Sequence, residues 1–365
     1  MQIRSLTLSN FRNIKEAELV PCAGINLIYG QNAQGKTNLL EAIWLFTGCK
    51  SFRSKRDKEM VQFSESFSKN EVVFTAYDRE QSACLWIDKK RTAMKNGVQL
   101  KSPAELIGSF YAVIFVPAHL SLVKDGPAFR RHFLDTALCE IRPKYAKALA
   151  RYHRILVQRN TLLKDIMQHS ELLDTLDIWD DRLAQMGAYI IAQRVAYADS
   201  LSEKAQSIYR GLSGNTEKLR ISYENNAQAY SNDPYLVKEQ LLSLLQRNRR
   251  SDLENHITTV GPHRDDLKIE IDGLSARNYG SQGQQRSVAL SLKLAEAEII
   301  EQETGEEPII LLDDVLSELD VTRQDYILNH IKKRQVFLTC CDPFNVQRQC
   351  SGKCFFVENG KVRET

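Results

Sequence analysis

Residues Gly30 to Thr37 have the types and spacing needed to bind a nucleotide phosphate. They read GQNAQGKT, which fits the pattern G-x-x-x-x-G-K-S/T. The apolar run 25–29 precedes them and the helix-forming residues 38–43 follow, so strand, loop and helix stand in the required order. In such a loop the backbone N–H groups face the phosphate, Lys36 reaches the outer phosphates and the Thr37 hydroxyl ligates Mg²⁺. A chance match in a glycine-containing turn is the alternative, and the flanking pattern argues against it.

Two adjacent carboxylates, Asp313 and Asp314, end the apolar run 308–312. A buried parallel strand that delivers an acid to a phosphate site has this form. A simple turn is the alternative, but together with the loop at 30–37 we interpret the pair as a Mg²⁺ ligand and a water-polarising base. Lys36 and Asp313 are 277 positions apart (313 − 36), so two distant halves must close the nucleotide fold around an insertion.

A second glycine-containing stretch, Tyr279 to Arg286, reads YGSQGQQR and leads into a predicted helix over 287–301. Small polar residues at a helix N-terminus place free N–H groups where the helix dipole favours an anion. A plain helix cap is the alternative. Upstream of it, residues 258–266 read TTVGPHRDD and precede an alternating strand at 267–272.

The remaining periodicity predicts the elements that position these residues. It predicts strands at 3–8, 14–20, 25–29, 111–116 and 335–342, a helix at 36–46, a meander over 72–94 and a hairpin with an Asn-Gly turn at 354–362. Between them lie helices at 129–138, 145–166, 176–212 and 235–246 and a strand at 219–223. We therefore expect an α/β fold, with a discontinuous nucleotide-binding head of residues 1–120 plus 256–365 and a mainly helical inserted lobe of residues 121–255.

Composition is that of an ordinary globular protein, with 43% hydrophobic and 26% charged residues among 365. The formal net charge is only +3, so a nucleic-acid surface would have to come from local clusters. Three segments qualify, 50–58 with five basic residues in nine, 151–159 and 247–250. A solvated loop is the alternative for the first.

The chain has neither a secretory signal at its start nor an apolar run long enough to span a membrane, so we expect a cytoplasmic protein and no membrane partner. Its eight cysteines are spread along the chain, which favours free thiols. The last four contain no C-x-x-C pair, and a zinc site there is not expected.

Five segments taken in order resemble the RecF family of bacterial recombination and repair proteins, and they read SLTLSNFRN, GQNAQGKTNLLEAI, TVGPHRDDL, SQGQQRSVALSLKLAE and IILLDDVLSELD. The resemblance implies an ABC-type P-loop ATPase head of the SMC/Rad50-like group, in which two subunits sandwich two ATP molecules. It implies an ATP-dependent homodimer that binds double-stranded and gapped DNA. It also implies RecO- and RecR-type mediator partners, recombinase loading at gaps and a part in the SOS response.

The resemblance also assigns roles residue by residue. It implies that the phosphates are held by Gly30, Gln31, Asn32, Ala33, Gln34, Gly35, Lys36 and Thr37. Mg²⁺ is assigned to Thr37 and Asp313, and the hydrolytic base is Asp314, acting with Lys36 and, from the other subunit, Ser281. Gly283 and Gln284 join Ser281 in that signature segment. Arg12 and Asn13 would contact the nucleotide, and Asp320 would belong to a D-loop at the dimer interface.

Three departures from the general ABC pattern predict slow turnover. The signature reads SQGQQ where transporters carry LSGGQ, the base is Asp314 where a glutamate is usual, and the switch position at 339–341 has no histidine. A shorter carboxylate and a missing histidine both align the attacking water poorly. We expect a weak, DNA-stimulated ATPase. The alternatives are a scaffold that binds ATP without significant turnover and a transporter's nucleotide-binding subunit, which the helical insertion disfavours.

Overall fold

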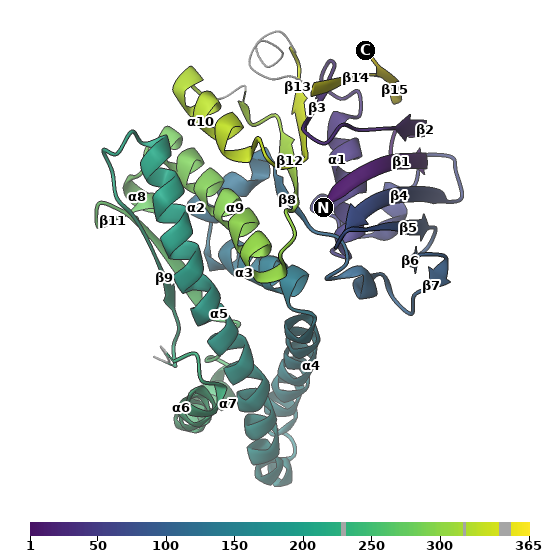
Figure 1. Ribbon diagram of the computed structural model, residues 1–365. Helices are drawn as coiled ribbons and strands as arrows, with labels where there is room; N and C mark the ends of the chain where they lie inside the picture. The colour runs from purple at the N-terminus through teal and green to yellow at the C-terminus, as the bar shows by residue number, and fades with distance from the viewer. Residues whose placement is uncertain (228–230, 317–318, 343–351) are drawn as a thin grey trace. The chain divides into compact units, whose positions relative to one another are not determined.

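The computed structural model describes the whole chain except residues 228–230, 317–318 and 343–351. It divides into two compact units (Figure 1). Unit 1 comprises Met1–Leu120, Gly211–Asn215 and Ala289–Thr365, and unit 2 comprises Ser121–Arg210 and Thr216–Val288. The contacts group residues 256–288 with the helical segment, whereas we expected those residues in the head. The reason is pairing, because the strand at 266–271 is hydrogen-bonded to the strand at 219–224.

Unit 1 contains a mostly parallel sheet in the order β15-β14-β3-β13-β12-β8. Its strands are β3 (Ile25–Tyr29), β8 (Ala112–Phe115), β12 (Ile309–Asp313), β13 (Val336–Cys340), β14 (Gly352–Glu358) and β15 (Lys361–Glu364). Only β15 runs antiparallel, as the second strand of the C-terminal hairpin. Every residue of β8, β12 and β13 is buried, as their continuous apolar sequences predict for strands covered on both faces.

The second sheet of unit 1 is antiparallel, in the order β2-β1-β4-β5-β6-β7. Its strands are β1 (Gln2–Phe11), β2 (Ile14–Leu19), β4 (Ser68–Ala76), β5 (Arg79–Ile87), β6 (Arg91–Lys95) and β7 (Val98–Gln99). Helix α1 (Lys36–Trp44) contacts β1 of this sheet and β8, β12 and β13 of the parallel sheet. Its apolar residues lie in one hydrophobic core with those of both sheets, so packing on two sides fixes the helix that follows the phosphate loop.

Short 3₁₀ turns and one further helix complete unit 1. These are η1 (Leu45–Thr47), η2 (Asp57–Met60), η3 (Pro103–Leu106), η4 (Pro117–Leu120) and α10 (Val321–Ile331). Helix α9 (Gln282–Thr304) begins in unit 2 and continues into unit 1. It begins at Gln282, five residues before the predicted start at Ser287, so the glutamine-rich segment is helical.

Unit 2 is mainly helical and carries a small sheet in the order β11-β10-β9. Its elements are α2 (Ser121–Lys124), α3 (Pro127–Ile141), α4 (Pro143–Asp165), η5 (Ser170–Thr175), α5 (Leu176–Leu212, its last two residues in unit 1), β9 (Leu219–Glu224), α6 (Pro234–Arg247), α7 (Arg249–Asn255), β10 (Asp266–Ile271), β11 (Leu274–Ser275) and α8 (Ala276–Tyr279). Proline at the first turn begins α3, α4 and α6, where its missing N–H costs no hydrogen bond.

No helix in the described part of the chain is both long and apolar enough to cross a membrane. The cysteines outside 343–351 are free thiols, as expected. Among the described residues no group of three histidine, cysteine or acidic side chains is arranged to hold a metal ion.

Candidate nucleotide site

The loop Gly30–Thr37 joins β3 to α1, and its conformation depends on two glycines. Gly30 has φ +150°, and a Cβ atom there would lie 2.2 Å from the Val357 carbonyl oxygen on β14. Gly35 has φ +119°, and a Cβ atom there would lie 2.6 Å from Asn13 Oδ1. At Gly30 the close atom belongs to the backbone of β14, so only glycine fits there. At Gly35 the close atom is the end of the Asn13 side chain, and it is the positive φ that favours glycine.

Gln34, in the middle of the loop, is held by two segments that are distant in the sequence. Asn13 Nδ2 donates a hydrogen bond to the Gln34 carbonyl oxygen over 2.9 Å. From the C-terminal hairpin, the Asn359 N–H donates to Gln34 Oε1 over 2.6 Å and the Gly360 N–H to the Gln34 carbonyl over 3.2 Å. The predicted Asn-Gly turn is therefore present, and it also supports the phosphate loop, which the sequence did not indicate.

The Lys36 side chain folds back over the start of the loop. Its Nζ donates to the carbonyl oxygens of Gly30 over 2.5 Å and of Gln31 over 2.9 Å. Cys341 Sγ lies 3.7 Å away. Backbone carbonyls of the loop therefore hold the ammonium group. An outer phosphate is expected to bind in this same loop.

Thr37 and Asp313 meet at the carboxyl ends of the parallel strands. Thr37 Oγ1 lies 2.9 Å from both carboxylate oxygens of Asp313. Thr339 is the partner of Asp313 in the β12–β13 register, and its Oγ1 donates to Asp313 Oδ1 over 2.8 Å. The next residue, Asp314, has φ +52°, and its N–H donates to Thr339 Oγ1 over 2.9 Å. The two halves of the predicted phosphate site are therefore brought together.

Burial raises the pKa of Asp313 above its ordinary value, and the neighbouring Asp314 adds to this. Hydrogen bonds from Thr339 and Thr37 lower the same pKa, as does the charge of Arg53. A buried carboxylate flanked by a hydroxyl oxygen offers the hard oxygen ligands that Mg²⁺ prefers. These residues therefore fit the predicted metal.

A cavity of about 390 Å³ opens over these groups. It is lined by Asn13, Asn32, Ala33, Gly35, Lys36, Thr37, Asn38, Arg53, Pro117, Asp313, Asp314 and Thr339. Thr339 belongs to the predicted switch position, whereas sequence reasoning did not assign Asn38, Arg53 or Pro117 to the site. Arg53 Nη1 donates to Asn38 Oδ1 over 2.6 Å, which turns one residue of the basic segment 50–58 toward the loop. The basic cluster at 50–58 was the sequence feature that could have pointed to Arg53 as a site residue.

Comparisons with known proteins agree with this geometry. A family model described as an AAA domain, AAA_23, matches residues 5–334. The DNA replication and repair protein RecF of Agathobacter rectalis is 41% identical over 366 residues, covering 99% of both chains. The chain belongs to the RecF family. The protein of the same name from Caldanaerobacter subterraneus is 40% identical over 366 residues and also covers 99% of both chains.

Solved structures extend the comparison to the fold. The recombination mediator protein RecF–ATPrS in the RecFOR pathway matches with a TM-score of 0.92 at 39% identity, covering 99% of this chain and 97% of that one. The Smc head domain of Pyrococcus furiosus matches at 16% identity with a TM-score of 0.58, over 100% of this chain and 96% of that one, which supports the fold alone. The predicted ABC-type ATPase head with an inserted helical lobe is confirmed.

Arg12 and Asn13 were both predicted to contact the nucleotide, but the two residues have different surroundings in this RecF family member. Asn13 lines the cavity. Arg12 Nε and Nη2 donate to the two carboxylate oxygens of Glu41 over 2.9 and 2.7 Å. Its Nη1 donates to the Glu59 carbonyl oxygen over 2.7 Å. Glu41 is fully buried on α1, so Arg12 acts here as the counter-ion of that carboxylate.

The predicted signature segment, with Ser281, Gly283 and Gln284, lies in unit 2. The Ser281 N–H donates to Gln284 Oε1 over 2.7 Å, and the Gln284 N–H donates to Ser281 Oγ over 3.2 Å. This reciprocal pair is a capping box at the start of α9, so the helix-cap alternative describes part of what these residues do. The Ser281 hydroxyl hydrogen stays available, because Oγ accepts in the capping bond. Gly283 follows within the first turn.

The predicted D-loop residue Asp320 caps α10, since its Oδ1 accepts from the Arg323 N–H over 3.0 Å. Residues 317 and 318, in the same motif, lie outside the described part of the chain.

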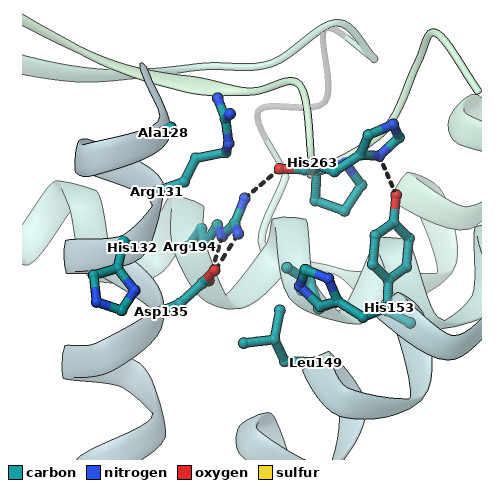
Figure 2. Close-up of a pocket in the computed structure, with 11 residues that line it drawn as sticks. Ala128, Arg131, His132, Asp135, Leu149, His153, Arg194 and His263 are labelled. Carbon is teal, nitrogen blue, oxygen red and sulfur yellow. Dashed lines mark hydrogen bonds and ion pairs between the residues drawn. The ribbon is translucent and has the colours of Figure 1, made fainter. Parts of the chain in front are cut away.

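The GPHRDD segment lines a different cavity, of about 400 Å³, within unit 2 (Figure 2). His263 Nδ1 lies 2.6 Å from the Tyr152 hydroxyl and Nε2 lies 3.0 Å from the Thr258 carbonyl oxygen, so both ring nitrogens are used. Burial lowers the pKa of His263 to about 4. Arg194 Nη2 donates to Asp135 and Nη1 to the Pro262 carbonyl, over 2.7 and 2.6 Å. The segment's polar groups are satisfied within the unit, which indicates a structural role.

Two of the three basic clusters each contain an arginine that is engaged by acids of the lobe. Arg159 is fully buried, with Nε 2.7 Å from Asp180 Oδ1 and Nη1 2.8 Å from Asp252 Oδ2. Our inclusion of Arg159 in a DNA-facing cluster is wrong, because its guanidinium joins α4, α5 and α7 inside the lobe. In the cluster at 247–250, Arg249 is paired with Asp177 and Asp180.

Proposed function

We propose that the chain is an ATP-driven homodimer that binds double-stranded and gapped DNA as a recombination mediator. The observation that carries the proposal is the meeting of the phosphate loop with Asp313 through Thr37, at 2.9 Å. The RecF–ATP and RecF–ATPrS structures, at 39% identity, support ATP as the nucleotide.

Roles follow for the residues that line the cavity. Backbone N–H groups of residues 30–37 and the Lys36 ammonium bind the phosphates, while Thr37 and Asp313 hold Mg²⁺. When bound, the ion neutralises charge that develops on the phosphate oxygens. Asp314 orients the attacking water and accepts its proton. Because this carboxylate is short and residues 339–341 include no histidine, we expect turnover to be slow.

The site is proposed to be composite. Ser281, Gly283 and Gln284 of one subunit complete the phosphate site of the other, with Asp320 at the interface. The functional division would then be a head of residues 1–120 plus 256–365 and a lobe of residues 121–255. In this proposal the protein acts in the cytoplasm together with RecO- and RecR-type partners. It acts at DNA gaps, where a recombinase is loaded and the SOS response begins.

The test is the dependence of ATPase activity per subunit on protein concentration and on added DNA. A composite site predicts that both raise the rate, whereas a monomer-competent enzyme responds to neither. A scaffold with no turnover shows ATP-dependent dimers without phosphate release.

Two substitutions sharpen this test. Lys36→Met should abolish nucleotide binding, because the ammonium is the main positive charge in the loop. Asp314→Asn should keep binding and trap the dimer. If the Asp314→Asn protein stays monomeric with ATP, the sandwich is excluded.

A further inference from the structure

Helices α4 and α5 of unit 2 form a groove of about 400 Å³ that has no part in the nucleotide site. It is lined by Arg151, Arg154, Ile155 and Gln158 from α4 and by Trp179, Arg182, Gln185 and Met186 from α5. Arg151 and Arg154 are three positions apart and share one face of their helix. The lining therefore combines three guanidinium groups with an apolar floor, and no acidic side chain contributes to it.

These three arginines differ from four other arginines of the lobe. Arg130, Arg159, Arg194 and Arg249 each form an ion pair with an aspartate. Within the described residues, Arg151, Arg154 and Arg182 form none. Arg182 lies over the Trp179 ring, with Cζ 5.8 Å from the ring centroid.

The acids nearest in sequence are already engaged. Asp180 accepts from Arg159 and Arg249, and Asp181 is paired with Lys238 at 2.7 Å. The groove therefore keeps an excess of positive charge that its own lobe does not neutralise.

Apolar side chains are exposed on the same hairpin. Val157 is 65%, Met167 70% and Ile178 56% exposed. Arginine, tryptophan and methionine are all enriched at protein interfaces, and arginine and tryptophan are among the residues that supply most of the binding energy there. Charge and composition together describe a docking surface for a negatively charged protein segment.

We propose that this groove binds an acidic peptide segment of a partner protein, with one apolar side chain of the segment seated against Ile155, Trp179 and Met186. Guanidinium forks pair bidentately with carboxylates, which matches the three open arginines. A single-stranded nucleic acid is the less suitable occupant, because base stacking needs an open aromatic face, whereas Trp179 is half-buried and Arg182 lies over its ring.

The experiment uses the full-length chain and a fluorescein-labelled peptide of several aspartates around one phenylalanine. Binding is followed by fluorescence anisotropy at low salt. The combined variant Arg151→Glu, Arg154→Glu and Arg182→Glu should weaken binding by at least about tenfold, because each change replaces a charge-assisted contact with repulsion. The peptide in which serine replaces the phenylalanine should bind more weakly than the parent peptide.

The matched control is Arg250→Glu, an exposed arginine of the same lobe whose partner is Glu254 one turn along α7. It should leave peptide binding unchanged. A second variant, Arg151→Gln with Arg154→Gln, removes charge without adding repulsion and serves if the triple variant does not fold. ATPase activity of each variant reports whether the fold is intact.

Three outcomes overturn the proposal. The first is no binding of the peptide to the wild-type chain, and the second is equal loss in the Arg250→Glu control. The third concerns an oligothymidylate of equal charge. It would bind the wild-type chain, fail to bind the triple variant, and leave the bound peptide in place, so that the peptide must occupy another site. That result would assign the groove to single-stranded nucleic acid.

Discussion

Thr37 Oγ1 lies 2.9 Å from both carboxylate oxygens of Asp313, although the two residues are 276 positions apart. The contact exists because β12 and β3 both pair with β13, so their carboxyl ends meet beside the N-terminus of α1. The hydroxyl and the carboxylate that would hold Mg²⁺ are therefore already adjacent before any ligand is considered.

Asp313→Asn is expected to raise the Mg²⁺ concentration needed for half-maximal ATPase activity by at least about tenfold, a loss typical of weakened metal sites. The amide keeps a hydrogen-bond acceptor for Thr37 and Thr339 but removes the negative charge. Magnesium titrations of ATPase rate measure the effect. Asp88→Asn, an exposed turn residue, is the matched control. An unchanged Mg²⁺ requirement would remove Asp313 from the metal site.

Arg53→Ala is expected to weaken ATP binding more than ADP binding, by about 1.5 to 3 kcal/mol, the range for a lost hydrogen bond to a charged group. The reason is position, since Arg53 lines the cavity beside Asp313 and Asp314. Binding of fluorescent ATP and ADP analogues measures the difference. Lys55→Ala, in the same basic segment but outside the lining, should bind both nucleotides as the wild type does. If the two variants lost the same amount of nucleotide affinity, Arg53 would act only through the overall positive charge of the segment and not through a specific contact.

Much of the site follows from local sequence, and the exceptions have a physical cause. The phosphate loop, the helix at 176–212 and the apolar strand before Asp313 are fixed by spacing and periodicity, so they were predictable. The bond between Asn359 and Gln34 joins residues 325 positions apart, and no local pattern encodes it. Arg159 shows the same limit, because a run of basic residues does not reveal that Asp180 and Asp252 face one of them inside the lobe.

Gly30→Ala is expected to destabilise the head and to abolish nucleotide binding. A methyl group at this position would lie 2.2 Å from the Val357 carbonyl, so the loop or β14 must move. Gly24→Ala is the control, because a Cβ atom there meets nothing within 4 Å. Thermal unfolding and nucleotide binding are measured together. If Gly30→Ala binds ATP normally, the contact between the loop and β14 does not constrain the loop.

The pKa values of Asp265 and His263 predict an unusual pH dependence of stability. Burial raises the pKa of Asp265 to about 6 and lowers that of His263 to about 4. Between about pH 4 and 6 the unfolded chain releases the aspartate proton while the folded chain keeps it, so this group costs stability as pH rises. His263 acts in the opposite direction, because the unfolded chain holds a proton that the folded chain lacks. The two contributions offset each other in the wild type.

Asp265→Asn removes one of these two contributions and leaves the other. The free energy of unfolding of the variant, relative to wild type, should rise by about 1.4 kcal/mol per pH unit between about pH 4 and 6. The amide keeps an acceptor for the Tyr223 hydroxyl, which lies 2.6 Å from Asp265 Oδ2, so the fold tolerates the change. Urea unfolding followed by tryptophan fluorescence at several pH values measures the slope. A difference that stays constant with pH would mean that Asp265 is ionised throughout this range in the folded protein.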